Sequence, residues 1–242
     1  MVRPRCAART AAGELIMFWQ ESQEEVRAVP DDVVDIVYQI ECRALPVDHA
    51  WLLSQAVCAV LPWVAEESTA GVHPIHVADS GNGWMRPENA SDLLCLSRRT
   101  KLVLRAPRGR IEAAQTLVGR QLDVAGHALR VGQSSLRPLS PITTIFSRYV
   151  VSVDGLDETA FLQAALREME AFGVRPKKML CGMEKIIATP DQPVHTRSLM
   201  LTELNQQESV TLQQRGLGPL RRLGCGLFIP HKDMRDLKQA LE

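Results

Sequence analysis

Four glycines and two arginines lie close together in the segment G-L-G-P-L-R-R-L-G-C-G-L-F, residues 216–228. Glycine lets backbone amides approach a ligand closely, and consecutive amides with positive φ form a concave anion site that nearby arginines strengthen. The segment differs from a dinucleotide fingerprint and from a Walker loop, because no strand precedes it and no Gly-Lys-Ser/Thr ends it. A tightly packed connection between a helix and a strand is the alternative. The candidate anion-binding residues are Gly216, Gly218, Arg221, Arg222, Gly224 and Gly226.

Three histidines in the first third of the chain have the chemistry of general acids and bases. His49 is expected in the first turn of a helix, whose positive end disfavours imidazolium and keeps the ring neutral near pH 7. Simple packing against the apolar stripe of that helix is the alternative. His73 and His76 lie three positions apart on an expected strand, so their side chains should face opposite sides and only one could join His49. As a pair they lack a third metal ligand, and no metal site or cofactor is predicted.

The charges of the chain balance, with 28 basic and 28 acidic residues among 242, but they are unevenly distributed. Residues 1–85 hold 5 basic and 12 acidic side chains, whereas 86–148 hold 11 and 4, and 175–232 hold 9 and 4. A neutral protein with two basic blocks can present a basic groove to a polyanion, because binding responds to the local field. A solvated arginine-rich surface is the alternative.

Composition also limits the class of protein. The longest apolar stretch near the start, residues 15–19, is too short for a membrane span or a signal peptide, so a cytoplasmic protein without a membrane partner is expected. The six cysteines contain no C-x-x-C pair, which argues against a zinc site or a disulfide framework.

The hydrophobic periodicity of residues 32–140 predicts the order β-α-β-β-α-β, the ferredoxin-like arrangement. Alternation at 34–42 indicates a strand, and the apolar spacing that follows indicates a helix that opens at Leu45-Pro46 and ends at Pro62. The remaining expected elements are a strand at 72–78, a glycine-rich turn at 80–84, a strand at 101–106, a helix at 108–118 and a hairpin at 122–136.

Residues 145–242 repeat this order after a short proline-containing linker. The expected elements are strands at 149–153, 179–188 and 195–201, helices at 157–172 and 206–215, and a final strand after the glycine-rich segment. The predicted fold class is therefore α+β, with two tandem ferredoxin-like (βαββαβ, RRM-like) domains at 32–140 and 145–242. Residues 1–31 lack periodicity and are expected to be a poorly ordered extension.

The glycine-rich segment resembles the signature of the CRISPR-associated RNA-binding superfamily known as repeat-associated mysterious proteins (RAMP). Within this superfamily the chain is most similar to the repeat-processing endoribonuclease, the sixth Cas protein family. The resemblance covers about residues 32–232. Further matching segments are R-A-L-P-V-D-H-A-W (43–51), G-V-H-P-I-H-V-A (71–78), S-G-N-G-W-M-R-P (80–87) and R-S-L-M (197–200).

The resemblance implies an endoribonuclease that cuts CRISPR precursor transcripts within the repeat, without a metal. The ribose 2′-hydroxyl would attack the scissile phosphate and leave a 2′,3′-cyclic (or 3′) phosphate and a 5′-hydroxyl. This reaction needs a base, an acid and cations near the phosphorane. The family often places a histidine at the first helix of the first domain, which matches His49. Other Cas subunits of a type I effector complex are the implied protein partners.

The chain departs from the family pattern in its supporting residues. Family active sites often add a tyrosine and a lysine, but this chain has only two tyrosines, both on expected first strands, and no lysine before Lys101. An arginine or Ser54 would have to replace them. The chain also lacks the aromatic pair of an RNA-recognition-motif sheet, so phosphate contacts and groove shape should recognise a repeat stem-loop. The expected RNA-binding residues outside the glycine-rich segment are Arg98, Arg99, Lys101, Lys177, Lys178 and Arg197.

Two other functions fit the same residues. One is a catalytically silent RNA-binding subunit of a CRISPR ribonucleoprotein, which would bind the repeat without cutting it. The other is a tandem ferredoxin-like sensor or enzyme for a small molecule, whose binding would depend little on salt, whereas phosphate contacts give a steep salt dependence.

Overall fold

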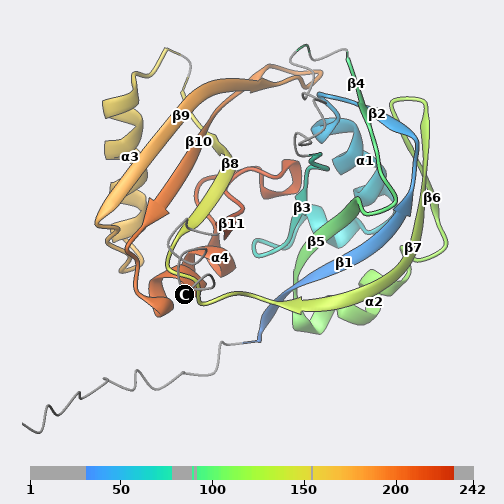
Figure 1. Ribbon diagram of the computed structural model, residues 1–242, viewed down its shortest axis with the longest axis horizontal. Coiled ribbons are helices and arrows are strands. Elements are labelled where there is room, and N and C mark those ends of the chain that lie inside the picture. The colour runs from blue at the N-terminus through green and yellow to red at the C-terminus, as the bar shows by residue number, and fades with distance from the viewer. Residues whose placement is uncertain (1–30, 78–88, 90–91, 154, 232–242) are drawn as a thin grey trace, which may run out of the picture.

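The first half of the chain forms a five-stranded antiparallel sheet with helices on one face (Figure 1). The computed structural model describes residues 31–77, 89, 92–153 and 155–231. The sheet order is β3-β5-β1-β7-β6, of which β3-β5-β1-β7 is the ferredoxin-like order. The elements are β1 Val33–Glu41, β2 Ala44–Pro46, α1 Ala50–Val60, η1 Pro62–Ala65, β3 Gly71–His73, β4 Leu93–Cys95, β5 Lys101–Pro107, η2 Arg108–Arg110, α2 Ile111–Gln115, β6 Gln121–Val124 and β7 His127–Pro138.

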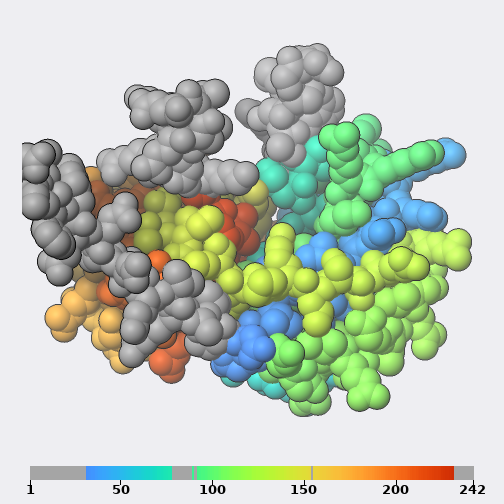
Figure 2. Space-filling view, turned by 60° about the horizontal axis from the view of Figure 1, so that its bottom comes forward, coloured from blue at the N-terminus to red at the C-terminus, as the bar shows by residue number. Residues whose placement is uncertain are grey.

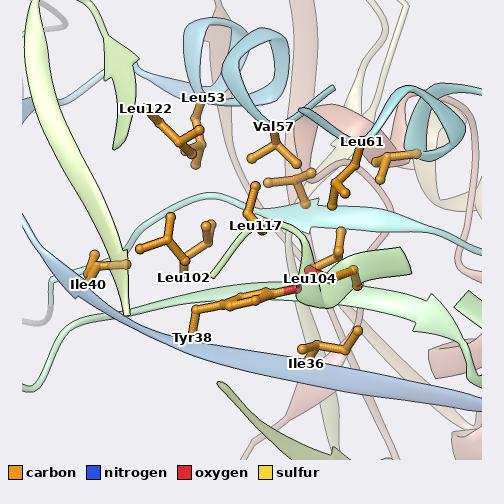
Figure 3. Packing of buried hydrophobic residues seen from close by; sticks show 14 of the residues in the cluster. Ile36, Tyr38, Ile40, Leu53, Val57, Leu61, Leu102, Leu104, Leu117 and Leu122 are labelled. Carbon is orange, nitrogen blue, oxygen red and sulfur yellow. Dashed lines mark hydrogen bonds between the residues drawn. The ribbon is translucent and has the colours of Figure 1, made fainter. Parts of the chain in front are cut away.

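Alternating apolar residues of β1 and β5 build the core of this first domain. Tyr38 and Leu102 are buried on the helix side of the sheet, where Leu53 and Val57 of α1 cover them (Figure 3). The Tyr38 hydroxyl donates a hydrogen bond to the carbonyl of Ala114 in α2 (2.9 Å), so the one polar group of this buried side chain has a partner. The core therefore fixes α1, and with it the residue that precedes α1, His49.

The second half forms a four-stranded antiparallel sheet of order β11-β8-β10-β9, again the ferredoxin-like order. Asp157 caps α3 by accepting a hydrogen bond from Ala160, and Asn205 with Glu208 forms a capping box on α4. Phe161 of α3 and Leu212 of α4 lie in one core. The elements are β8 Ile145–Val151, α3 Glu158–Glu170, β9 Lys178–Ile187, β10 Val194–Thr202, α4 Gln206–Arg215, η3 Arg221–Leu223 and β11 Ile229–Pro230.

The two-domain α+β architecture agrees with the sequence prediction, but several boundaries were wrong. Residues 44–46 do not begin a helix; they form β2, which pairs with the unanticipated β4. The predicted strand at 72–78 ends at His73, and most of the predicted helix at 108–118 is short 3-10 and turn structure around α2. The predicted strand at 149–153 begins already at Ile145, and the last strand has only two residues.

Two expectations lie outside the described residues. These are the turn at 80–84 and, apart from Asp31, the N-terminal extension. In the ranges that the structure describes, no helix is long and apolar enough to cross a membrane.

Arg105 is fully buried in β5 and joins the two domains. Its guanidinium donates to both carboxylate oxygens of Asp35 on β1 (Nε to Oδ1 2.8 Å, Nη2 to Oδ2 3.2 Å). Its Nη1 donates to the backbone carbonyls of Gln213 (3.0 Å) and Phe228 (2.8 Å) in the second domain. Arg137 of β7 adds a hydrogen bond to Asp35 (3.0 Å). Asp35, Arg105 and Arg137 thus form one hydrogen-bonded group of charges on three neighbouring strands, and Arg105 connects this group to the second domain.

This arrangement stabilises the ionised form of Asp35. Burial raises the pKa of the Asp35 carboxyl, but the positive charge of Arg105 and the contacts with His73 and Arg105 outweigh burial and hold the pKa well below its usual range. The stabilisation is complete above the unfolded pKa of about 3.9 and is lost as the pH falls through the lower, folded pKa.

Asp35→Asn should reduce the free energy of unfolding by about 3–5 kcal/mol at pH 7, because it leaves Arg105 buried without its anion. The difference from the unmutated protein should shrink as the pH falls below about 4, where the unmutated protein loses the same interaction. Urea unfolding at a series of pH values measures both effects. Asp191→Asn, at an exposed position in the β9–β10 turn, is the control. A pH-independent difference for Asp35→Asn would contradict this account.

Candidate nucleic-acid interface and active site

His49 lies at the junction of the two domains, at the N-cap position of α1, where its side chain makes no capping hydrogen bond. Its ring is buried, with 2% exposed, and both nitrogens contact the backbone. The amide of Ile75 donates to Nε2 (2.9 Å), so Nε2 is the acceptor nitrogen. Nδ1 therefore carries the proton and donates a hydrogen bond to the carbonyl of Pro46 (2.8 Å). The hydrogen bonds select the neutral ring, with the lone pair on Nε2.

The residues around His49 contact the second domain directly. The Asp48 carboxylate accepts a hydrogen bond from the amide of Ala188, just after β9 (2.7 Å). Ala50 packs in an apolar cluster with Ile187, Leu223 and Cys225, which joins the start of α1 to β9 and to the loop after α4. The first domain thus holds the His49 ring through Pro46 and Ile75, and the residues on both sides of His49 contact the second domain.

The structure separates the two histidines of the predicted pair. His73 points toward Asp35 (Nε2 to Oδ1 3.7 Å), and burial lowers its pKa, which favours the neutral ring. His76 lies beyond the end of β3, so the argument from strand alternation does not apply to it. His76 is exposed and follows Ile75, whose amide holds His49. Of the pair, His76 is the one accessible to a ligand near His49.

Ser54 does not lie on an accessible surface. Its side chain is fully buried in α1, and its hydroxyl lies beside the Cys58 thiol. Ser54 therefore cannot contact an RNA in this conformation, because its helix face is turned into the core.

The glycine-rich segment forms a closely packed connection. All four glycines have a positive φ: 73° at Gly216, 72° at Gly218, 86° at Gly224 and 66° at Gly226. A Cβ at Gly226 would lie 1.9 Å from the carbonyl oxygen of Leu217, and one at Gly224 would lie 2.1 Å from Pro74. Gly218 alone of the four has open space where a Cβ would be, and its amide donates to Glu168 (2.7 Å). Packing thus explains Gly224 and Gly226 without a ligand.

The two arginines of this segment point into the protein. Arg221 is 8% exposed, and its guanidinium donates to the carbonyls of Thr69 (2.9 Å) and Ala70 (3.3 Å) in the first domain. Arg222 is half-buried near Cys58 of α1, where its positive charge partly offsets the effect of burial, which raises the pKa of the Cys58 thiol. The expectation that this pair reinforces an open anion site is not met for Arg221, whose hydrogen bonds join the domains instead.

The other predicted RNA-binding residues lie in separate regions. Arg98 and Arg99 are exposed before β5, and Lys101 is half-buried at its start. Lys177 and Lys178 are exposed at the start of β9, where Lys178 forms an ion pair with Glu203. Arg197 is half-buried and donates to the carbonyl of Leu156 (3.2 Å). The structure therefore does not bring these six residues into one basic face.

Two features of the structure were missed from the sequence. Phe146 and Tyr149 of β8 lie on the sheet face away from α3, with Arg148 5.6 Å from the ring centre of Phe146 and Lys185 5.9 Å from that of Tyr149. The other feature is the Asp35–Arg105 pair. A visible signal existed for it, because V-V-D-I-V and L-V-L-R-A each contain one opposite charge within an apolar strand.

The described residues contain no group of three or more His, Cys, Asp or Glu side chains placed to hold a metal ion. The two antiparallel sheets have the ferredoxin-like order, and a glycine-rich connection leads from α4 to the last strand of the second sheet. Together these features define a RAMP-type protein.

The comparisons with known proteins identify the family. The Cas6 Crispr family model matches residues 34–233, and the chain belongs to the Cas6 family. It is 34% identical over 197 residues, 81% of each chain, to the CRISPR-associated endonuclease Cas6 of Myxococcus xanthus (strain DK1622).

Solved structures confirm the fold at low sequence identity. A CRISPR-associated protein Cas6 matches with a TM-score of 0.60 and 12% identity over 83% of this chain and 100% of that one. A protein described as a RAMP protein binding different RNA substrates matches with a TM-score of 0.55 and 13% identity over 82% and 100%. A Cas6-related protein from Pyrococcus furiosus matches with a TM-score of 0.54 and 12% identity over 83% and 99%.

Alanine substitutions at two glycines of the connection should have very different effects. Gly218→Ala should cost about 1–2 kcal/mol of unfolding free energy, because it adds only left-handed backbone strain. Gly226→Ala should cost clearly more, because its Cβ would also overlap the Leu217 carbonyl oxygen. Thermal or urea unfolding compares the two variants. Equal losses of unfolding free energy would mean that both glycines are needed only for their backbone conformation, and would contradict the role of close packing at Gly226.

Proposed function

We propose that this chain is a metal-independent endoribonuclease that binds CRISPR repeat RNA and cleaves the precursor transcript into guide RNAs. The observation that carries the proposal is the 34% identity to the Myxococcus xanthus endonuclease over 81% of both chains. The similarity of its fold to a RAMP protein that binds RNA substrates is consistent with it. The proposed site of action is the cytoplasm, and the proposed partners are a repeat stem-loop and other Cas subunits of a type I effector complex.

His49 is the proposed general base. With the proton on Nδ1 and the lone pair on Nε2, the ring can accept the proton of the ribose 2′-hydroxyl. The 2′-oxygen then forms a bond to phosphorus as the bond to the 5′-oxygen breaks, leaving a 2′,3′-cyclic phosphate and, after the leaving oxygen takes up a proton, a 5′-hydroxyl. Addition of water to the cyclic phosphate would give the 3′ phosphate in a second step. For the first step the substrate hydroxyl must replace the Ile75 amide at Nε2.

His76 is the proposed acid that protonates the leaving 5′-oxygen. It is exposed, and it follows the residue whose amide holds His49. His73 is less suited to this role, because its ring is directed at Asp35. Exposed cations such as Arg98, Arg99, Lys177 and Lys178 would attract the RNA backbone, which contributes affinity and a steep salt dependence.

One observation favours the silent-subunit alternative. His49 is 2% exposed and both of its ring nitrogens are bonded to the protein, so this conformation has no base ready for a substrate. If the Ile75 contact does not open when RNA binds, the chain would bind the repeat and not cut it.

His49→Ala should lower the single-turnover rate of repeat RNA cleavage by about 10²–10⁴-fold in EDTA and leave RNA affinity nearly unchanged, because general base catalysis contributes about that much. The assay uses end-labelled repeat RNA at saturating protein, beside a matched RNA with a 2′-deoxy nucleotide at the cut. His195→Ala is the matched control, because this histidine is bonded to Glu184 on the edge of the second sheet.

Three outcomes separate the possibilities. Cleavage of only the all-ribose RNA, lost in His49→Ala and retained in His195→Ala, supports the proposal. Equal cleavage by His49→Ala would transfer the role of base to His76 or His73. Binding of both RNAs without any cleavage by the unmutated protein would establish the silent subunit.

A further inference from the structure

A large groove lies at the end of the first domain, formed by segments that are far apart in the sequence. Its volume is about 1580 Å³, and its walls come from residues 39–44, the loop at 96–98, residues 118–119, the turn residue Gly126 and the first half of β7. In Figure 1 these segments meet near the labels β2, β4 and β6, away from the second domain. In Figure 2 the blue, green and yellow-green surfaces of the first domain lie next to one another at the right of the molecule. The groove exceeds the size of typical small-molecule pockets, which suits a polymer.

Three arginines from three elements line this groove. Arg43 follows β1, Arg98 precedes β5, and Arg130 belongs to β7. All three are exposed, and none forms a salt bridge with another described residue. Glu41 is the one carboxylate among the described lining residues, so the groove is positively charged. Arginine is suited to phosphate groups because its planar guanidinium donates two parallel hydrogen bonds.

The wall and floor of the groove offer further contacts for a nucleic acid. The pairing of β1 with β7 shifts between Tyr38 and Ile40, so that Gln39 faces two residues, Gly132 and Gln133. Such a bulge interrupts the ladder and redirects side chains, and bulges are common beside functional sites. Val118 on the opposite wall is 37% exposed and provides an apolar surface against which a base can pack.

The groove is connected to the candidate active site by a short strand. Arg43 and Ala44 line the groove, and β2 runs from Ala44 to Pro46, whose carbonyl accepts the Nδ1 hydrogen of His49. Three residues of extended chain span about 10 Å. A few nucleotides would therefore connect a phosphate in the groove to a phosphate at His49.

We propose that this groove binds single-stranded RNA adjacent to the cleaved phosphate, with Arg43, Arg98 and Arg130 on consecutive backbone phosphates and Val118 against a base. This inference rests on the proposed function and adds a second contact region to it. The RNA chain would follow β2 between the two regions. An acidic polypeptide is the other polyanion that could enter the groove, but the continuity with His49 favours RNA.

The test replaces all three arginines by glutamine in the full-length protein. Their side chains are exposed, so the fold should be retained, and a thermal melt verifies it. Arg167→Gln, on the exposed side of α3 in the second domain, is the matched control. Affinity is measured from low to high salt with repeat RNA that extends on both sides of the cut and carries a 2′-deoxy nucleotide there. Single-turnover cleavage of the all-ribose RNA at saturating protein is measured in parallel.

The proposal predicts that the triple variant binds the extended RNA at least ~10-fold more weakly and that the slope of log affinity against log salt falls by about 0.7 for each arginine. The cleavage rate at saturation should be unchanged, because these arginines do not contact the reacting atoms. Removing the nucleotides on one side of the cut should abolish the difference between the variant and the unmutated protein, and removing those on the other side should not.

Unchanged affinity and salt slope in the triple variant would overturn the groove proposal while leaving the endoribonuclease proposal intact. Failure of the unmutated protein to bind or cut the repeat would instead overturn the proposed function. If poly-L-glutamate binds the unmutated protein but not the triple variant, and RNA affinity is unchanged, the groove is a site for acidic polypeptides and the RNA assignment is wrong.

Discussion

The buried ion pair of Arg105 with Asp35 is the interaction on which the relative position of the two domains depends. Moving a guanidinium out of water is costly, and an apolar pair can match the stability of a buried ion pair. Here Arg105 also donates to the carbonyls of Gln213 and Phe228, at the two ends of the connection that contains the glycines. An apolar side chain would leave those buried carbonyls without partners. The charge therefore specifies how the second domain docks.

That docking determines the surroundings of His49. With Gln213 and Phe228 held by Arg105, the intervening chain folds back against β3, and Gly224 fits against Pro74. Pro74 precedes Ile75, whose amide holds the ring of His49. A bulkier residue at 224 would push on this segment directly. The glycine-rich connection thus influences the candidate base through packing, and an effect of loop mutations on cleavage does not require contact between the loop and the RNA.

Much of the fold was predictable because its signals are local. The alternation in β1 depends only on neighbouring residues. The same holds for α3, which shows helical periodicity and is followed by Gly173 with a positive φ. Local signals of this kind predicted an α+β order for each domain. β2 and β4 were missed because three-residue strands carry too little periodicity, and their pairing joins residues almost fifty positions apart. The helix predicted at 108–118 was too long, because residues 108–110 form a 3-10 helix and residues 116–119 form a turn on the two sides of α2.

The candidate site was less predictable, since its properties depend on long-range contacts. His49 was predicted in the first turn of a helix, and the structure places it at the N-cap position, just before α1. Its bond to Ile75 comes from a segment 26 residues away, which the sequence pattern does not show. Arg221 appeared to be a ligand-binding residue because sequence does not distinguish an arginine that faces an anion from one that binds carbonyls of another domain. The three arginines of the groove are likewise separated by more than fifty and thirty residues, and only the fold brings them together.

The most direct test of the account is the protonation state of the His49 ring, measured by ¹⁵N NMR of histidine-labelled protein near neutral pH. The account predicts a neutral ring with the proton on Nδ1 and a hydrogen-bonded lone pair on Nε2. Addition of repeat RNA with a 2′-deoxy nucleotide at the cut should then change the Nε2 signal as the Ile75 contact opens. A ring with its proton on Nε2, or one whose signals do not respond to bound RNA, would contradict the assignment of His49 as the base.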